Sequence, residues 1–397
     1  MLVFTFPGQG SQRPEMGRDW VEHPSWEIVA DAGAATGRDV TRLLLDADAE
    51  ELTRTSNAQL ATFTMSLVAL DAIERLGLAP AACAGHSLGE YTALVASGAL
   101  SFEDGARLVA ERGQAMQAVA DDEPGTMAAI LGLEDDAAEA ACARAENQAW
   151  VANYNAPGQV VISGSPNGVA EAGSVAKEMG AKRVMPIAVG GAFHTPMMAP
   201  ARDRLRKALA EVTFEDPETP VVANVDARVH AKAGAWSGLL SAQLCSPVRW
   251  RQSVGALTRL GPEPHTFVEV GPGGVLTGLA KRMSPGSHAL KVGQPDDLDK
   301  LVRDIAGPAA PQSYISAHQG EHLYMSERVI VSPSTGVFTP DPDLVGSVAT
   351  GDRVGQVGPA EVRSPFAGAL MGFLAVGGER VTQGQPLAWL RSVGGEE

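Results

Sequence analysis

The sequence has few cysteines, fewer basic than acidic residues, and no long apolar run. Three cysteines in 397 residues, Cys83, Cys142 and Cys245, form no paired spacing, which predicts reduced thiols rather than disulfides or a zinc motif. No apolar run approaches the roughly 18 residues that a membrane span needs. The segment Met1–Pro7 has no basic flank and is too short for a signal peptide. We therefore expect a cytoplasmic protein that does not span a membrane.

The charge balance narrows the class of partner. The formal net charge is −16, from 31 basic and 47 acidic residues. This balance argues against nucleic acid or an anionic membrane as the main partner, and an acidic partner protein would need a local basic patch. Hydrophobic content of 45% and charged content of 20% are typical of a globular protein, with a length that suits two or three structural units.

Short apolar runs alternate with longer stretches of helical period, which predicts an α/β fold with a largely parallel sheet. Phe102–Val119 carries apolar and small residues at alternating spacings of four and three, an amphipathic stripe. The expected strands are Leu2–Phe6, Ala81–Ala84, Val221–Val225 and Thr266–Val270, and the expected helices are Thr62–Arg75, Glu90–Ala96 and Phe102–Val119.

The stretch 126–189 has a different pattern. Strand and helix candidates follow in the order β-α-β-β-α-β, which predicts a ferredoxin-like subdomain over residues 125–189. It would be inserted into a hydrolase-like α/β core made of residues 1–124 and 190–306. A cleft between core and insert is the natural ligand site.

The C-terminal part has another composition. A linker is expected over 307–328, around Pro308–Pro311, and residues 329–392 show the short alternating runs of an all-β domain. Ser332-Pro333-Ser334-Thr335-Gly336 recurs as Ser364-Pro365-Phe366-Ala367-Gly368, and Gly351-Asp352-Arg353-Val354 as Gly378-Glu379-Arg380-Val381. These repeats predict a pseudo-symmetric β module.

Gly85-His86-Ser87-Leu88-Gly89 follows the apolar segment Pro80–Ala84 and precedes the helical Glu90–Ala96. This is the context of a nucleophile elbow, in which a serine on a sharp strand-to-helix turn lies beside helix N–H groups that stabilise an oxyanion. An ordinary glycine-rich turn is the alternative.

Gln9 follows the first strand and can reach the same sheet edge. His194 follows the insert directly and is a candidate general base, although a lone histidine is more often structural.

Five segments together resemble malonyl-CoA:acyl carrier protein transacylases, over roughly residues 1 to 305. They are Phe6-Pro7-Gly8-Gln9-Gly10-Ser11-Gln12, Gly85-His86-Ser87-Leu88-Gly89-Glu90-Tyr91, Asn153-Tyr154-Asn155-Ala156-Pro157-Gly158-Gln159, Gly191-Ala192-Phe193-His194 and Val270-Gly271-Pro272-Gly273. The resemblance implies that Ser87 attacks the thioester of malonyl-CoA with His194 as base. The phosphopantetheine thiol of an acyl carrier protein then takes the malonyl group.

The resemblance also implies roles for other residues. The backbone carbonyl of Gln243 would orient His194, and the N–H groups of Gln9 and Leu88 would form the oxyanion hole. Arg112 matches the arginine that pairs with the malonyl carboxylate, where an intrahelical ion pair is the alternative. Phe193 and Asn155 lie in the matching segments and are candidate substrate contacts. Leu88 and the Gly-Ala-Phe-His segment are malonyl-type variants, so methylmalonyl is not expected as the main substrate.

The β module looks similar to biotinyl and lipoyl carrier domains, whose fold is a barrel-sandwich hybrid. Such a domain needs a lysine on the hairpin between its halves, but Gln356–Glu361 occupies that place and no lysine follows Lys300. We therefore expect no biotin or lipoate, no cofactor other than the phosphopantetheine that arrives on CoA or the carrier, and a module retained for docking a partner or for assembly.

Three further motifs have competing interpretations. His318-Gln319-Gly320-Glu321-His322 has the letters of a zinc motif but no helical context, so no metal is expected. Gly271–Gly274 resembles a dinucleotide loop, but its third glycine is misplaced. Lys182, Arg183, Lys281 and Arg282 are candidates for a basic patch that receives CoA phosphates or an acidic carrier, with a scattered solvated surface as the alternative.

Two other function classes stay open from the sequence. A serine thioesterase that clears acyl groups would use the same Ser87 and His194 but would gain little from Arg112. A subunit that serves only assembly of an acyl-transfer complex is the second alternative, suggested by the module without lysine.

Overall fold

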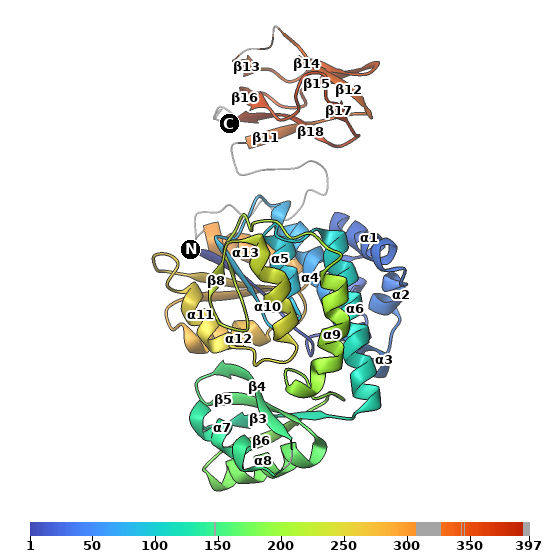
Figure 1. Ribbon diagram of the computed structural model, residues 1–397. Coiled ribbons are helices and arrows are strands. Elements are labelled where there is room, and N and C mark those ends of the chain that lie inside the picture. Colours follow the sequence, from blue (N-terminus) through green and yellow to red (C-terminus); the bar gives the residue numbers. More distant parts are fainter. Residues whose placement is uncertain (147, 307–326, 343, 345, 392–397) are drawn as a thin grey trace. The chain divides into compact units, whose positions relative to one another are not determined.

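The computed structural model describes residues 1–146, 148–306, 327–342, 344 and 346–391 (Figure 1). The chain divides into two compact units, Met1–Ala310 and Pro311–Glu397. Most of the expected linker 307–328 and the whole His318–His322 motif lie outside the described residues.

A six-stranded sheet forms the centre of the larger unit, with strand order β10-β9-β1-β2-β7-β8. All neighbours are parallel except β7 and β8, so the largely parallel sheet is confirmed. The strands are β1 (Leu2–Phe6), β2 (Ala82–Gly85), β7 (Val221–Val222), β8 (Val229–His230), β9 (Thr266–Val270) and β10 (His288–Val292). The expected strand Val221–Val225 is shorter in the structure because Asn224 N donates to the side chain of Glu90 instead of to a neighbouring strand.

Helices cover both faces of this sheet, because successive strand residues point to opposite sides. Phe4 and Phe6 pack into one core, and Val3 packs into a second. The first core also takes side chains from α1 (Glu27–Thr36), α2 (Val40–Leu45), α3 (Ala49–Thr53), α4 (Thr55–Glu74), α5 (Gly89–Ala96), α6 (Phe102–Asp122), α9 (Ala199–Leu209), α10 (Trp236–Gln243) and α13 (Asp296–Ala306). The second core takes them from α11 (Trp250–Leu257) and α12 (Val275–Met283).

Two of these helices carry site residues. Helix α6 begins after Ser101, whose hydroxyl accepts a hydrogen bond from Asp104 N at 3.1 Å, an N-cap. Its stripe of Ala106, Val109 and Met116 is buried, as the amphipathic pattern predicts. Helix α4 begins seven positions before the expected Thr62. It is buried on nearly all sides, so no amphipathic stripe marks its first two turns.

A four-stranded antiparallel sheet with two helices is inserted after α6. The elements follow in the predicted order β-α-β-β-α-β, and the sheet order is β4-β5-β3-β6. The backbone of Tyr154 and of Ala152 bonds to Val248 of the core, at 2.9 and 2.8 Å, which fastens the insert to the loop before α11. The elements are β3 (Thr126–Leu131), α7 (Asp135–Arg144), β4 (Ala149–Ala156), β5 (Gln159–Gly164), α8 (Pro166–Glu178) and β6 (Arg183–Ile187).

The smaller unit contains two four-stranded antiparallel sheets, with orders β11-β18-β16-β13 and β15-β14-β12-β17. Phe338, Val354 and Leu390 are among the side chains of its own buried core. The strands are β11 (Glu327–Val331), β12 (Gly336–Pro340), β13 (Ser347–Val348), β14 (Arg353–Val357), β15 (Ala360–Arg363), β16 (Gly368–Phe373), β17 (Arg380–Val381) and β18 (Pro386–Arg391).

Hydrogen bonds in this unit follow an internal two-fold repeat. Ser332 Oγ donates to the carbonyl of Ser334 and Ser364 Oγ to that of Phe366, both at 2.6 Å. Ser332 then pairs with the backbone of Gly384 and Gln385, and Ser364 pairs with that of Gly351 and Asp352. The structural counterpart of Gly351-Asp352 is therefore Gly384-Gln385. Gly378-Glu379, where the sequence of Gly351-Asp352 recurs, has a different place, because those two residues pair with Phe338 of β12.

Candidate active site

Ser87 lies on a tight turn between β2 and α5, with a left-handed φ of 53°. A non-glycine residue in this region costs roughly 1–3 kcal/mol unless its surroundings hold it there. Two side-chain amides do so, because Asn224 Oδ1 accepts from Ser87 N at 2.7 Å and Gln243 Nε2 donates to Ser87 O at 2.8 Å.

The glycines two positions before and after the serine are sterically required. A Cβ on Gly85 would lie 1.8 Å from the Gly89 carbonyl carbon, and a Cβ on Gly89 would lie 2.1 Å from Phe6 O.

Ser87 and His194 form a hydrogen-bonded pair. The Ser87 Oγ to His194 Nε2 distance is 2.7 Å, and His194 Nδ1 lies 2.9 Å from the carbonyl oxygen of Gln243. Because a carbonyl only accepts, Nδ1 carries the proton and Nε2 faces the serine as an acceptor. Burial, followed by the charge of Arg112, lowers the pKa of His194 to about 3. The imidazole is therefore neutral at neutral pH and able to take the proton of Ser87.

Arg112 points from α6 to the same serine. Its Nη2 lies 3.1 Å from Ser87 Oγ and 2.9 Å from Gln243 Oε1, and its Nη1 lies 2.7 Å from Gln59 Oε1. The guanidinium carbon lies 5.5 Å from the centre of the Tyr91 ring. Burial lowers the pKa of Arg112, but an arginine stays charged in proteins. Within the described residues no carboxylate forms an ion pair with it, so the expected alternative of an intrahelical pair is not the arrangement present.

Gln9 and Leu88 lie on neighbouring segments that leave the sheet at one edge. Strands β1 and β2 are parallel with Phe6 opposite Gly85, and His86 N donates to Phe6 O at 2.9 Å. Leu88 is fully buried at the start of α5. This register brings the loop after β1 beside the serine turn, where parallel strands of an open α/β sheet present ligand sites.

Phe193 precedes His194 in the chain, and Asn155 contacts the residue before the nucleophile. Phe193 is buried in the core, with its ring against Gly191. Asn155, at the end of β4, accepts a hydrogen bond from Nε2 of His86, the residue before the nucleophile, at 2.9 Å. The inserted sheet thus contacts the serine turn through His86.

The four basic residues expected to form a patch lie in two exposed pairs. Lys182 and Arg183 lie at the start of β6, and Lys281 and Arg282 lie in the last turn of α12. Lys182 contacts the Gly132 turn, and Arg282 contacts the adjoining turn at Gly158 and donates to Gln159 Oε1 at 3.1 Å. Since Gly132 N bonds to Gly158 O at 2.8 Å, the structure brings Lys182 and Arg282 to neighbouring turns of the insert.

A cavity of about 450 Å³ includes His194 in its wall. Its other walls come from α7 and β4 of the insert and from the segments after His194 and Gln243. They include Trp150, Tyr154, Pro196, Cys245 and Pro247. The cavity is thus lined by both the insert and the core, with His194 on the core side.

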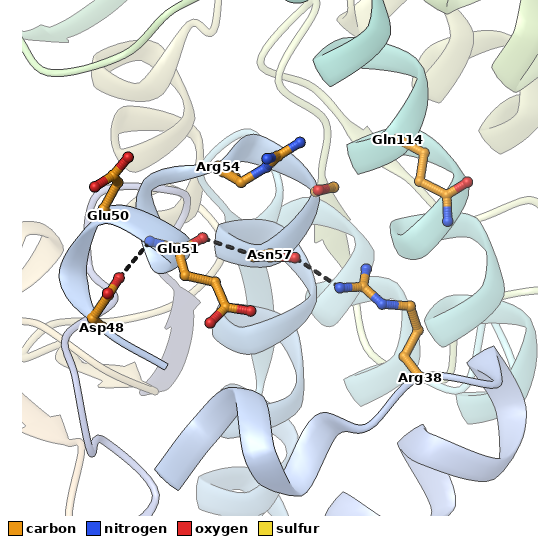
Figure 2. Close-up of a pocket in the computed structure, with 8 residues that line it drawn as sticks. Arg38, Asp48, Glu50, Glu51, Arg54, Asn57 and Gln114 are labelled. Carbon is orange, nitrogen blue, oxygen red and sulfur yellow. Dashed lines mark hydrogen bonds between the residues drawn. The ribbon is translucent and has the colours of Figure 1, made fainter. Parts of the chain in front are cut away.

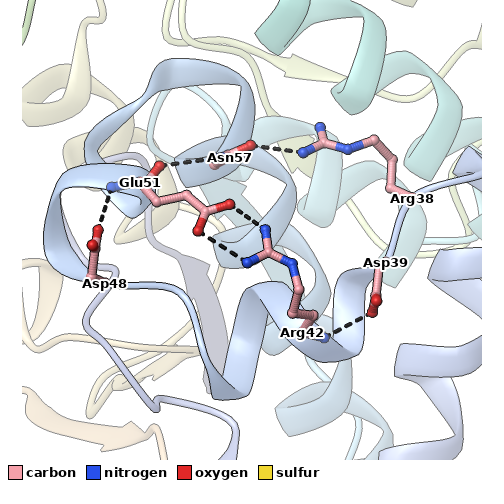
Figure 3. Close-up of polar contacts among 6 residues, drawn as sticks. All are labelled: Arg38, Asp39, Arg42, Asp48, Glu51 and Asn57. Atoms are coloured by element: carbon pink, nitrogen blue, oxygen red, sulfur yellow. Dashed lines mark hydrogen bonds and ion pairs between the residues drawn. The ribbon is translucent and has the colours of Figure 1, made fainter.

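A second cavity, of about 730 Å³, lies between the turns around α2 and α3 and helix α6 (Figure 2). Some of its polar groups bind one another or neighbouring residues. Arg38 donates to Asn57 Oδ1 at 2.7 Å, Asn57 donates to the carbonyl of Glu51, and the Glu51 carboxylate forms a two-pronged ion pair with Arg42 (Figure 3). None of the residues around Ser87 lines this cavity, and we interpret its hydrogen bonds and ion pair as structural.

Three residues of the site were not predicted. Gln59 lies in the part of α4 that the periodicity missed, and Asn224 follows a strand that is only two residues long. Glu90 belongs to the Gly-His-Ser-Leu-Gly-Glu-Tyr segment, but its position in that segment does not indicate which groups it contacts.

The chain was compared with known proteins. The family model described as "Acyl transferase domain" matches residues 3–303. The malonyl CoA-acyl carrier protein transacylase of Escherichia coli K12 is 44% identical over 305 residues, which are 75% of this chain and 97% of that protein. The protein of the same name from Bacillus subtilis strain 168 is 39% identical over 309 residues, which are 77% of this chain and 97% of that protein.

Solved structures agree with these matches. An acyl-carrier-protein S-malonyltransferase from Burkholderia pseudomallei superposes with a TM-score of 0.72 at 40% identity, covering 76% of this chain and 99% of that one. A malonyl-transacylase in complex with a type II polyketide acyl-carrier protein superposes with a TM-score of 0.72 at 37% identity, covering 75% of this chain and 98% of that one. The family match ends at residue 303, before β11.

Proposed function

We propose, since the chain belongs to the acyl transferase family and to its malonyl-CoA:acyl carrier protein transacylases, that it transfers a malonyl group from malonyl-CoA to an acyl carrier protein. The observation that carries this proposal is the contact of one serine hydroxyl with both a neutral histidine and a buried arginine. The first pair supplies a nucleophile, and the arginine supplies a site for a free carboxylate.

In the first half-reaction Ser87 Oγ attacks the thioester carbon of malonyl-CoA, and its proton passes to His194 Nε2, 2.7 Å away. The C–S bond then breaks, and CoA leaves as the thiol after taking the proton from the imidazolium. The Gln243 carbonyl, which accepts from Nδ1–H, stabilises that imidazolium and holds the ring. We assign the oxyanion hole to the N–H groups of Leu88 and Gln9, at the start of α5 and after β1.

Arg112 supports selectivity for malonyl. A malonyl ester carries its free carboxylate one methylene beyond the carbonyl, so an arginine that already contacts the nucleophile lies within reach of that carboxylate. Acetyl lacks this group and would leave the buried cation without an anionic partner. Phe193 and Asn155 complete our assignment: Phe193 as an apolar wall, and Asn155 as support of the serine turn through His86.

In the second half-reaction the phosphopantetheine thiol gives its proton to His194 Nε2 and attacks the ester carbon. The C–O bond breaks, and Ser87 Oγ takes the proton back. We place the phosphopantetheine in the cavity of about 450 Å³ that has His194 in its wall. We assign Lys182, Arg183, Lys281 and Arg282 to contacts with CoA phosphates or the acidic carrier, and no further cofactor enters the reaction.

The smaller unit is the part that the family match leaves unexplained. We propose that it is a barrel-sandwich hybrid like that of biotinyl and lipoyl domains, supported by its two four-stranded sheets and its internal two-fold repeat. The hairpin between the two halves joins β14 to β15 through Gly358-Pro359 and has no lysine for attachment. A docking or assembly role is therefore our assignment for it. We likewise assign the insert to the ferredoxin-like class, which its element order supports.

A cytoplasmic location is also part of the proposal, and the three free thiols Cys83, Cys142 and Cys245 support a reducing compartment. No helix in the described ranges is both long and apolar enough to cross a membrane.

The experiment that tests the function supplies malonyl-CoA and a holo acyl carrier protein and measures the malonyl-carrier and free malonate formed. We expect malonyl-carrier, and acetyl-CoA should transfer far more slowly. Release of free malonate with no loaded carrier would favour the thioesterase, and no reaction of either kind would favour an assembly subunit.

A further inference from the structure

The proposed mechanism leaves one buried carboxylate of the site without a role. Glu90 lies on α5, three residues after the nucleophile, and its side chain is fully buried. Its Oε1 accepts from Asn224 N at 2.8 Å, and its Oε2 accepts from the side-chain amide of Gln243. Both oxygens thus have a donor, and neither donor belongs to a positively charged side chain.

The two groups that Glu90 binds are those that hold the catalytic residues. Asn224 accepts from Ser87 N, and Gln243 donates to Ser87 O. The backbone carbonyl of Gln243 accepts from His194 Nδ1. Removal of Glu90 would therefore free groups that lie one hydrogen bond away from the nucleophile and its base.

Glu90 also sets which way the Gln243 amide points. Gln243 Nε2 donates to Glu90 Oε2, so the NH₂ end of the amide faces Glu90 and its oxygen turns away. That oxygen, Oε1, accepts from Arg112 Nη2 at 2.9 Å. With the amide turned the other way, its NH₂ group would face the guanidinium, two donors against each other.

Charge supports the same relationship. Arg112 is buried with no ion-paired carboxylate within the described part of the chain, and Glu90 is the acid that faces it across the Gln243 amide. Burial raises the pKa of Glu90 to about 7, against the lowering effects of its hydrogen bonds from Asn224 and Gln243 and of the charge of Arg112. In its ionised form Glu90 stabilises the nearby cation without bonding to it directly.

We propose that Glu90 is a positioning residue, which fixes the Arg112 guanidinium for the malonyl carboxylate by orienting the side-chain amide of Gln243. This inference rests on the proposed malonyl transfer.

The test compares the wild type with Glu90→Gln. The substitution keeps size but turns one acceptor oxygen into a donor, so one of the two N–H groups that face it loses its partner. We measure the rates of Ser87 acylation by malonyl-CoA and by acetyl-CoA, each divided by the fraction of enzyme that is folded. We expect the malonyl rate to fall at least tenfold and the malonyl-to-acetyl ratio to fall with it. A purely structural role would lower the folded fraction and leave this ratio unchanged.

Glu269→Gln is the matched control. Glu269 is also a buried glutamate of the larger unit, and its carboxylate accepts from Thr277 rather than from a site residue. We expect it to change stability without changing the malonyl-to-acetyl ratio.

Gln243→Met gives a second, independent variant, since it removes the amide and keeps the backbone carbonyl that bonds to His194. If Glu90 acts through that amide, Gln243→Met alone lowers the ratio, and adding Glu90→Gln to it changes the ratio little further. An unchanged ratio in both Glu90→Gln and Gln243→Met would overturn the proposal. If Glu90→Gln does not fold, an unchanged ratio in Gln243→Met alone would overturn it. A wild type that forms no malonyl-enzyme would instead contradict the proposed function.

Discussion

Nη2 of Arg112 lies 3.1 Å from the hydroxyl oxygen of Ser87, and the side-chain amide of Gln243 bonds both to that Nη2 and to the backbone carbonyl of Ser87. The cation to which we assign substrate selection and the backbone of the nucleophile are therefore held by one amide side chain. This closeness explains how a three-carbon diacid can satisfy both groups at once, and it leads to the first prediction.

Substitution of Arg112 by alanine should lower the rate of malonyl transfer about 10- to 100-fold, because a charge-assisted hydrogen bond contributes roughly 1.5–3 kcal/mol. Acetyl transfer should fall much less. Single-turnover acylation with each CoA ester measures both rates. Arg204→Ala on α9 is the control, because Arg204 forms a solvent-accessible ion pair with Glu111, the neighbour of Arg112 on α6. Equal losses for malonyl and acetyl would contradict the role of Arg112.

Substitution of Asn224 by alanine should destabilise the protein by about 1–3 kcal/mol for each buried group left without a partner, among them Ser87 N and Gly85 O. The serine turn would also lose one of the two amides that hold its left-handed φ, so acylation should slow as well. Urea unfolding and the acylation rate check the two effects. A variant with reduced stability and an unchanged acylation rate would show that the turn does not need Asn224.

The pKa of His194 gives a pH prediction. With this pKa lowered to about 3, the imidazole stays neutral through the range where an ordinary histidine, with a pKa near 6.5, becomes protonated. Burial raises the pKa of Glu90 to about 7, so the test of His194 uses the Glu90→Gln variant, which removes that titration. In this variant the acylation rate should stay nearly constant from about pH 8 to about pH 6. A rate that halves near pH 6.5 would contradict the burial effect.

The same shift makes a stability prediction, with the sign set by linkage. The unfolded chain binds a proton at His194 near pH 6.5, and the folded chain does so only near pH 3. The stabilisation is therefore complete above about pH 6.5 and is lost as the pH falls toward 3. A His194→Gln variant should lose less stability than the wild type between pH 7 and pH 5, as measured by the free energy of unfolding at each pH. Parallel pH curves for the two proteins would contradict this assignment.

Substitution of Gly89 by alanine should prevent the turn from forming, since the new Cβ would lie 2.1 Å from Phe6 O. Overpacking of this kind typically costs about 1–3 kcal/mol, and contact with rigid backbone puts this site at the upper end. Gly278→Ala is the control, because Gly278 lies inside α12 with no atom within 4 Å of the added Cβ. Thermal unfolding should show a loss for Gly89→Ala and no loss for Gly278→Ala.

Much of this architecture could be predicted from the sequence because its elements are regular. Leu2–Phe6 and Thr266–Val270 are short apolar runs between turns, and the structure has strands with those bounds. The serine turn was predictable because the two glycines of a Gly-x-Ser-x-Gly segment leave room for a tight turn between a strand and a helix. Ser87, His194, Gln243 and Arg112, which the resemblance to the transacylases assigned to one site, are joined by a ring of hydrogen bonds in the structure.

The residues that were missed share a physical reason. Gln59 and Asn224 are buried polar groups on elements that show no clear period: one helix is buried on nearly all sides, and one strand is two residues long. Their function depends on partners far away in the chain, such as Gln59 on Arg112. The β module shows the same limit, because its hydrogen bonds pair Gly351-Asp352 with Gly384-Gln385 although Gly378-Glu379 has the more similar letters.

The intact mass of the protein after incubation with malonyl-CoA alone, followed by peptide mapping, tests the central claim most directly. We expect a mass increase of one malonyl group in the wild type, located on the peptide that contains Ser87 and absent from Ser87→Ala. A malonyl adduct of equal amount on Ser87→Ala, or one mapped to a different residue, would contradict the account.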